Sequence, residues 1–170
     1  MQAAGQENLM ELARGHDAGT DINAADETGW TALMLACAMC QERAVRQLLD
    51  WGADVHIKDE NGDTALIGAS AAFCSGQTVK GQTSIVRMLL QRGANPNTQD
   101  YAGETALMAV TTYGNVGALR VLLDAGARPE VKDNAGRSAL DYAHEALKKY
   151  NDHLWTPELR KLVKALESLQ

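Results

Sequence analysis

One eight-residue segment occurs four times along the chain, and this repetition constrains the fold more than any other feature. Each copy begins with Asp, has Gly three residues later, and ends with Thr or Ser followed by Ala and Leu. The copies are Asp26–Leu33, Asp59–Leu66, Asp100–Leu107 and Asp133–Leu140, separated by 33, 41 and 33 residues. A period of this length predicts one supersecondary unit per repeat. Such a unit cannot bury its apolar face alone and is stable only when stacked on its neighbours.

The residue types within one copy predict a turn followed by two helices. Asp26 and Gly29 suit a tight turn, because the Asp side chain accepts backbone N–H groups and Gly tolerates positive φ. Thr31 predicts the N-cap of a first short helix. The apolar spacing from Val45 to Leu49 predicts a second helix, which a Gly-Ala pair ends. The first helix is expected to contribute apolar positions such as Leu33, Leu35 and Ala36.

A second signature, Leu-Leu followed by Gly-Ala, recurs at Leu48–Asp54, Leu89–Asn95 and Leu122–Arg128. Together, the two signatures resemble the ankyrin repeat, and the resemblance covers the chain from about residue 20 to the C-terminus. It implies an all-α solenoid of ankyrin repeats, in which paired antiparallel helices are joined by β-hairpin-like turns. About four full repeats would follow a reduced N-terminal one.

The repeat boundaries divide the chain into a partial N-terminal cap repeat, 1–25, and four further repeats: 26–58, 59–99, 100–132 and 133–170. The spacing between the two helices is longer in the second and fourth of these repeats. This predicts inter-helix insertions at 73–80 and at 147–157. After the second insertion, Thr156 and Pro157 suit the start of a last helix in a C-terminal capping repeat.

The composition excludes several classes of function. With 16 Lys and Arg against 22 Asp and Glu, the net charge is −6, whereas nucleic-acid backbones and anionic membranes need a basic surface. No stretch approaches the roughly 18 apolar residues of a membrane span. Three cysteines without a framework spacing indicate reduced thiols and a cytoplasmic location. No Gly-x-Ser-x-Gly, His-Glu-x-x-His or phosphate-binding glycine loop occurs, so we expect neither an enzyme nor a cofactor.

Cys37 and Cys40 have the Cys-x-x-Cys spacing of redox and metal sites. The reactive form of this motif lies at a helix N-terminus, where the dipole lowers the thiol pKa, but here the pair is predicted at a helix C-terminal end. Cys74 adds a third thiol, and three Cys without a fourth ligand make a poor zinc site. We therefore predict no metal site. A redox or metal sensor built on Cys37, Cys40 and Cys74 stays as the alternative of a different class.

In the ankyrin family, partners usually bind the concave surface that turn tips and first helices form. By resemblance, the predicted partner-binding residues are the large or charged side chains at the matching variable positions: Trp30, Met39, Asp63, Tyr101, Glu104, Tyr113 and Arg137. Trp, Tyr and Arg are frequent in binding hot spots. The acidic residues on this surface predict a partner protein with a basic or mixed surface, bound by a chain that is monomeric by itself. The alternative contact surface is the pair of inserted loops.

Overall fold

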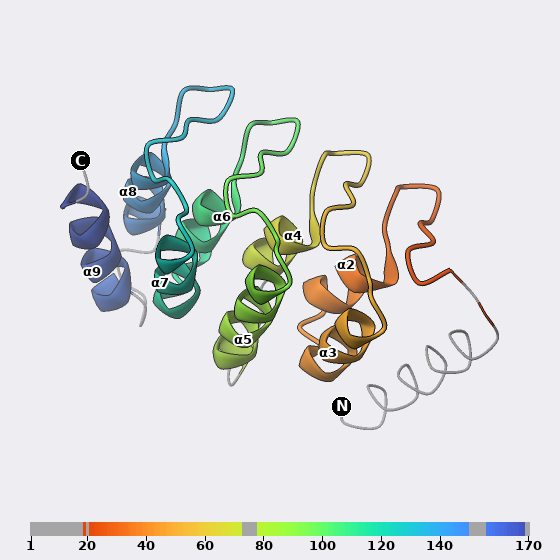
Figure 1. The fold of residues 1–170 in the computed structure, drawn as a ribbon. Helices are drawn as coiled ribbons and strands as arrows, with labels where there is room; N and C mark the ends of the chain where they lie inside the picture. Colours follow the sequence, from red (N-terminus) through yellow and green to blue (C-terminus); the bar gives the residue numbers. More distant parts are fainter. Residues whose placement is uncertain (1–18, 20, 73–77, 150–155, 169–170) are drawn as a thin grey trace.

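The computed structural model describes residues 19, 21–72, 78–149 and 156–168. Its helices form two rows that run the length of the molecule (Figure 1). The first helices of successive repeats are α2 (Ala32–Ala38), α4 (Ala65–Ala71), α6 (Ala106–Tyr113) and α8 (Ala139–Lys149). The second helices are α3 (Glu42–Asp50), α5 (Thr78–Gln91), α7 (Val116–Asp124) and α9 (Thr156–Glu167). Each helix contacts its counterpart in the next repeat, so the predicted all-α solenoid is confirmed.

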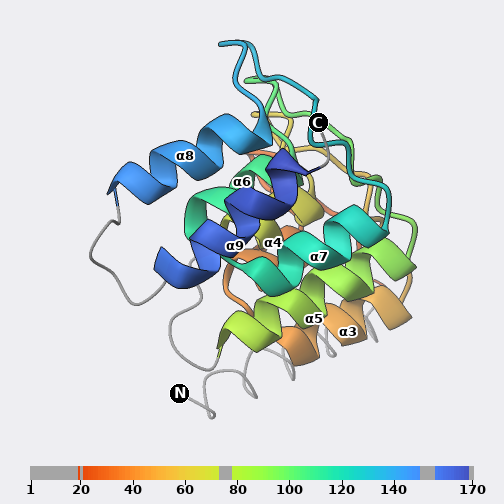
Figure 2. The same cartoon turned by 90° about the vertical axis from the view of Figure 1, so that its left-hand side faces the viewer.

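An Asp-closed turn precedes each first helix, and all four turns project from the same side of the solenoid (Figure 2). In the second repeat, Asp59 Oδ1 accepts the backbone N–H of Asp63 at 2.8 Å, and Gly62 has a φ of +81°. A single antiparallel bridge joins Lys58 to Thr64, and equivalent bridges occur in the other three repeats. The turns are therefore hairpin-like, as expected.

The first helices begin at the predicted N-caps. A threonine hydroxyl accepts the backbone N–H of the residue three positions later in three repeats, at Thr31, Thr64 and Thr105. In the last repeat, the carboxylate of Asp141 accepts both the backbone N–H and the hydroxyl of Ser138, each at 2.7 Å. The backbone N–H of Asp141 in turn donates to the Ser138 hydroxyl at 3.4 Å, so the two residues pair backbone N–H groups that the helix start leaves without intrahelical partners.

Neighbouring turns pack so closely that the glycines in three of them have no room for a side chain. A Cβ added at Gly103 would lie 2.8 Å from the backbone nitrogen of Asn134 in the next turn. At Gly29 and Gly62, a Cβ would meet backbone atoms of the following turn at 2.9 Å. At Gly136, in the last turn, it would meet nothing within 4 Å. The stacking of turns, as well as their local conformation, therefore requires glycine at the first three positions.

The core lies between the two helix rows and continues from repeat to repeat. Its largest fully buried side chains come from both rows: Leu33, Leu48, Leu66, Ile85, Leu89, Leu107, Met108, Leu119, Leu122, Leu162 and Leu166. Because each repeat buries its apolar face against the next, the rows hold the turns and first helices at fixed relative positions.

Both predicted insertions are partly helical, which corrects the expectation of two inter-helix loops. α5 begins at Thr78 and has 14 residues, against nine in α3 and α7. The last three residues of 73–80 therefore belong to this helix. α8 continues to Lys149 and α9 begins at Thr156, so both ends of 147–157 are helical too. Helix extension pairs the backbone groups of added residues within the segment, which a loop does not. Residues 73–77 and 150–155 lie outside the described residues.

Candidate partner-binding surface

The repeats place equivalent residues in register along one side of the first-helix row. The residue before each N-cap is Trp30, Asp63, Glu104 or Arg137. In the second turn of each helix the corresponding residues are Leu35, Gly68, Ala109 and Tyr142, and one turn later Ala38, Ala71, Thr112 and Glu145. We call these positions, together with Met39 and the turn residue Tyr101, the inner face. It corresponds to the predicted concave surface.

Large apolar side chains are exposed on the N-terminal part of the inner face. Leu35 and Met39 lie four residues apart on one side of α2 and are 51% and 57% exposed. Trp30 is 37% exposed and Tyr101 68% exposed. Among the described residues, these four are the only exposed large hydrophobics. None of them lies on the second-helix row.

Leu35 was expected to be an apolar position of the first helix, and its exposure was missed. The helical period explains the difference, because Leu33, Ala36 and Cys37 define the buried side of α2 and Leu35 projects away from them. Counting 3.6 residues per turn from Leu33 would have placed Leu35 on the opposite side.

Trp30 is fixed by the neighbouring repeat. Its indole Nε1 donates a hydrogen bond of 2.9 Å to Asp59 Oδ2. The other oxygen of the same carboxylate accepts the backbone N–H of Asp63. Asp59 itself is buried. Trp30 thus joins two repeats through its polar atom and still leaves part of its ring in solvent.

Asp63 is half-buried, and no hydrogen bond or ion pair joins its carboxylate to any of the described residues. Burial is the largest effect on this group, and the nearby Asp59, Asp100 and Glu104 add like-charge repulsion. Together they raise the pKa of Asp63 to about 6. At neutral pH the fold therefore holds an ionised carboxylate in a place that disfavours its charge.

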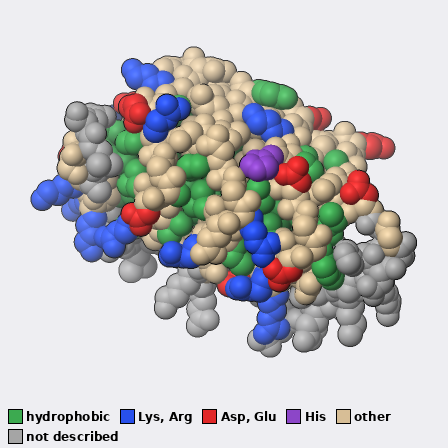
Figure 3. All heavy atoms as spheres, viewed as in Figure 1, with side chains coloured by type: hydrophobic (Ala, Val, Ile, Leu, Met, Phe, Trp, Pro, Cys, Tyr) green, Lys and Arg blue, Asp and Glu red, His purple; other side chains and the backbone are tan. Residues whose placement is uncertain are grey.

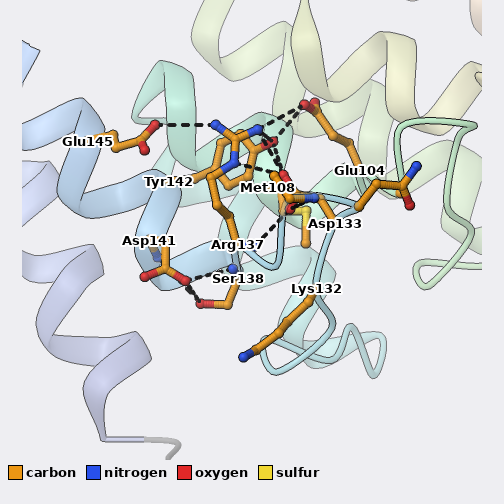
Figure 4. Close-up of polar contacts among 12 residues, drawn as sticks. Glu104, Met108, Lys132, Asp133, Arg137, Ser138, Asp141, Tyr142 and Glu145 are labelled. Atoms are coloured by element: carbon orange, nitrogen blue, oxygen red, sulfur yellow. Dashed lines mark hydrogen bonds and ion pairs between the residues drawn. The ribbon is translucent and has the colours of Figure 1, made fainter.

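Glu104 and Arg137, both predicted to contact a partner, belong to one polar cluster between the third and fourth repeats (Figure 4). The guanidinium of Arg137 lies 2.8 Å from Asp133 Oδ2 and 3.9 Å from Glu104 Oε1. It also stacks on Tyr142, with 4.5 Å between the guanidinium carbon and the ring centroid. The Tyr142 hydroxyl lies 2.6 Å from Glu104 and 2.9 Å from Asp133. These internal contacts occupy the side chains that the sequence assigns to binding.

Burial and the two flanking carboxylates raise the pKa of the Tyr142 hydroxyl well above its ordinary value. The hydroxyl is therefore a donor that stays protonated, and it can give its single proton to only one carboxylate at a time. Asp133 receives additional N–H donors, including the backbone N–H of Arg137, and its pKa is lowered although burial opposes this. Tyr142 was not among the residues predicted to contact a partner, although it occupies the same register position as Leu35 in the first repeat.

The three remaining predicted residues are Met39, Tyr113 and Tyr101. Met39 is the C-cap of α2, and its thioether sulfur lies 3.9 Å from Gln41 Nε2. Tyr113 is the last residue of α6, but its side chain lies outside the described residues. Tyr101 lies against the preceding turn, where its ring would contact a Cβ at Gly62 at 2.8 Å, and Lys58 Nζ is 5.9 Å from its centroid.

The cysteines differ from the expectation of reduced thiols. Cys40 is disulfide-bonded, so that expectation is wrong for Cys40. Cys37 is free and buried, and burial raises the pKa of its thiol far above the ordinary range. Such a thiol is unreactive at neutral pH. Because disulfides form mainly in oxidising compartments, the cysteines no longer support the predicted cytoplasmic location.

Within the part of the chain that the structure describes, no group of three or more His, Cys, Asp and Glu could hold a metal ion. No helix in that part is long and apolar enough to cross a membrane. On the side of the molecule seen in Figure 3, acidic and basic side chains are interspersed with apolar and neutral ones.

Comparison with known proteins agrees with this architecture. The family model of ankyrin repeats (3 copies) matches residues 1–100 and 71–154. The chain therefore belongs to the ankyrin-repeat family. No match was found among curated proteins. Ankyrin repeats are generally protein–protein interaction modules, and proteins built from them are typically non-catalytic scaffolds.

Proposed function

We propose that this chain is a non-catalytic interaction module that binds a partner protein through its inner face. The observation that carries the proposal is where the exposed large hydrophobics lie. All four that the structure describes are on the inner face or the adjoining turn of the first three repeats. Scattered apolar residues are normal on a monomer, whereas a group of them on one side marks a contact surface.

The preorganisation of this surface supports the same function. Trp30 is hydrogen-bonded to the next repeat, and Met39 and Leu35 project from a helix packed on both α3 and α4. Side chains already fixed in place lose less entropy when a partner binds. A stacked array therefore presents a broad contact surface without ordering it first.

The charge of the inner face supports a partner with a basic or mixed surface. Asp63 is ionised at neutral pH but has no cation among the described residues. A basic group on the partner would offset both the burial and the repulsion from neighbouring carboxylates. We infer that the chain acts as a monomer in this role, with its apolar surface covered by the partner.

Truncation of the exposed hydrophobics tests the proposal. The triple variant Leu35→Ala, Met39→Ala, Tyr101→Ala removes apolar area from the inner face without touching the buried core. A matched control, Arg87→Ala, Gln91→Ala, Arg120→Ala, truncates exposed residues of α5 and α7. Native lysate is passed over the wild type and both variants, and the retained proteins are compared by quantitative mass spectrometry.

We expect a specific protein to be retained by the wild type and the control and lost from the inner-face variant. The loss should be tenfold or more, since truncating a few hot-spot residues costs about 1–3 kcal/mol each. A partner retained equally by the inner-face variant would exclude this surface. Contact would then be expected at the inserted segments 73–80 and 147–157, the alternative surface that the sequence offers.

A further inference from the structure

The polar cluster between the third and fourth repeats shows how this fold holds a cation. The guanidinium of Arg137 lies on the ring of Tyr142 and beside the carboxylates of Asp133 and Glu104. One carboxylate belongs to the turn of the fourth repeat and the other comes from the third. The ring's negative face and two carboxylates from adjacent repeats thus surround one positive charge (Figure 4).

The first and second repeats bring similar groups together. Asp59 is the counterpart of Asp133 in the repeat register, and Asp63 is the counterpart of Arg137. Trp30 supplies an aromatic ring from the preceding repeat. The two oxygens of Asp59 hold the Trp30 indole at 2.9 Å and the backbone of Asp63 at 2.8 Å. One buried carboxylate therefore links the Trp30 ring to the backbone of Asp63, the residue that follows Trp30 in the repeat register.

The two sites differ in the charge of the residue that precedes the helix N-cap. Where the fourth repeat supplies Arg137, the second repeat supplies Asp63, and no described residue provides a cation to it. The nearest basic residue in sequence, Lys58, is directed elsewhere. Its Nζ donates to the carbonyl oxygen of Gln99 at 2.8 Å and lies 5.9 Å from the Tyr101 ring. Among the described residues, the Trp30 ring and the carboxylates of the second repeat thus lack the internal cation that the fourth repeat has.

The helix beside Asp63 also leaves room for an approaching chain. Gly68 lies in the interior of α4 with ordinary helical φ, where glycine costs about 1 kcal/mol relative to alanine. A Cβ at Gly68 would meet nothing within 4 Å, so packing inside the chain does not require the glycine. Its neighbour along the inner face, Ala71, is also small. The small residues of α4 therefore leave space beside Asp63 on the inner face. Larger side chains lie to one side of this space on α2 and, further along, at Tyr142 on α8.

We propose that Trp30 and Asp63 bind an arginine side chain of the partner, and that Leu35 and Met39 bind an adjacent apolar side chain of the same segment. The partner is then a protein with an exposed segment that carries arginine next to an aliphatic or aromatic residue and crosses α4 at Gly68. Arginine fits better than lysine because its planar guanidinium both stacks on a ring and pairs with a carboxylate. This inference rests on the inner face being the contact surface.

A displayed library of random twelve-residue peptides, selected on the intact chain, tests the inference while the natural partner is still unidentified. One enriched peptide is synthesised, and its Kd is measured by fluorescence anisotropy against the wild type and five variants, of which Asp63→Lys reverses the charge. Asp63→Asn removes the charge at equal size, and Trp30→Leu removes the ring. Asp124→Asn, on α7 in the other helix row, removes the same charge as a control. Leu35→Ala combined with Met39→Ala removes the apolar contact.

We expect the enriched peptides to share an arginine at a fixed distance from an apolar residue. Asp63→Asn and Trp30→Leu should each weaken binding tenfold or more, whereas Asp124→Asn should change the Kd less than twofold. Replacing the peptide arginine by lysine should weaken binding, and replacing it by glutamate should abolish binding to the wild type. Asp63→Lys should restore binding of the glutamate peptide, a rescue that misfolding could not produce.

The outcomes separate this inference from the function on which it rests. Peptides that need Leu35 and Met39 but tolerate Asp63→Asn would overturn the arginine site and leave the inner face as the contact surface. Peptides that bind all the inner-face variants unchanged would overturn both. Enriched peptides with no arginine preference, or a library in which no binder depends on Trp30 or Asp63, would also overturn the arginine site.

Discussion

Asn115 Nδ2 donates a hydrogen bond of 2.7 Å to Gln82 Oε1, and both side chains are buried. The amide nitrogen of Gln82 shares its two hydrogens among the carbonyl oxygens of Ala69, Ser70 and Ala72, at 2.9 to 3.1 Å. Gln82 therefore pairs the backbone carbonyl groups at the C-terminal end of α4. Asn115 Oδ1 accepts the N–H of Ala118 at the start of α7. Two side chains join the second repeat to the third at the point where the helix spacing becomes longer.

Replacing Gln82 by alanine should destabilise the array. The substitution removes the buried amide that pairs the last carbonyls of α4 and accepts one hydrogen bond from Asn115, which costs about 1–3 kcal/mol. Gln91→Ala is the matched control, because Gln91 lies on the same helix but is exposed, and a change of less than about 0.5 kcal/mol is expected there. Urea unfolding followed by circular dichroism measures both. Equal midpoints for the two variants would show that the buried amide contributes nothing.

The turn glycines should differ in their tolerance of alanine. Gly103 and Gly136 have nearly the same φ, +81° and +80°, so alanine brings the same backbone strain of about 1–2 kcal/mol at each. Of these two glycines, only Gly103 has backbone atoms of the next turn within 3.0 Å of an added Cβ. Gly103→Ala should therefore cost about 1–3 kcal/mol more than Gly136→Ala. Thermal unfolding of the two variants gives the comparison, and an equal loss in both would mean that the turns do not pack as described.

Neutralising Asp63 should stabilise the fold in a pH-dependent way. The pKa of Asp63 is raised to about 6 from the ordinary 3.8, so the folded chain binds this proton more tightly than the unfolded chain does. Folding stability from this group is full below pH 4 and is lost as the pH rises through 6. Asp63→Asn should therefore raise the urea midpoint at pH 7.5 and leave it unchanged at pH 4. The control Asp124→Asn should not raise the midpoint at pH 7.5. If Asp63→Asn lowered stability at pH 7.5, the carboxylate would have a structural role instead.

The same variant separates stability from binding. If Asp63 serves a partner, Asp63→Asn should bind the arginine peptide more weakly while unfolding at a higher urea concentration. If Asp63 only stabilised the fold, the substitution would lower both the affinity for the peptide and the urea midpoint. Opposite signs of the two changes are thus expected for a binding residue, as for many functional sites.

Cys37 should resist alkylation in the folded chain. Its thiol is buried and its raised pKa keeps it protonated, whereas the thiolate is the nucleophile. In the presence of a reductant at pH 8, iodoacetamide should modify Cys40, which is half-exposed, long before Cys37. Peptide mass spectrometry measures both, and Cys37 should react only after urea is added. Rapid modification of Cys37 without urea would reopen the possibility of a thiol-based sensor.

The fold could be predicted in detail because the relevant signals are local. An Asp-x-x-Gly turn, a Thr or Ser N-cap and an apolar helix stripe each act within a few residues, and the 33-residue period shows that units so formed must stack. The lengths of the inserted segments were visible as well. Their structure was not, because an added residue can extend a helix or form a loop at similar local cost. Thr78 and Lys149 turned out to belong to helices.

The candidate site could be predicted only in outline. The sequence by itself determined the turns, the caps, the register of the repeats and which positions vary along the inner face. Only the tertiary structure decided which of those side chains stay available. Trp30 and Arg137 occupy equivalent positions, yet the Trp30 indole makes one hydrogen bond to the next repeat, whereas the Arg137 guanidinium is already paired with the carboxylates of Asp133 and Glu104. These contacts join residues in adjacent repeats, and they depend on how far each side chain reaches across the stacking distance, which a repeat period does not encode.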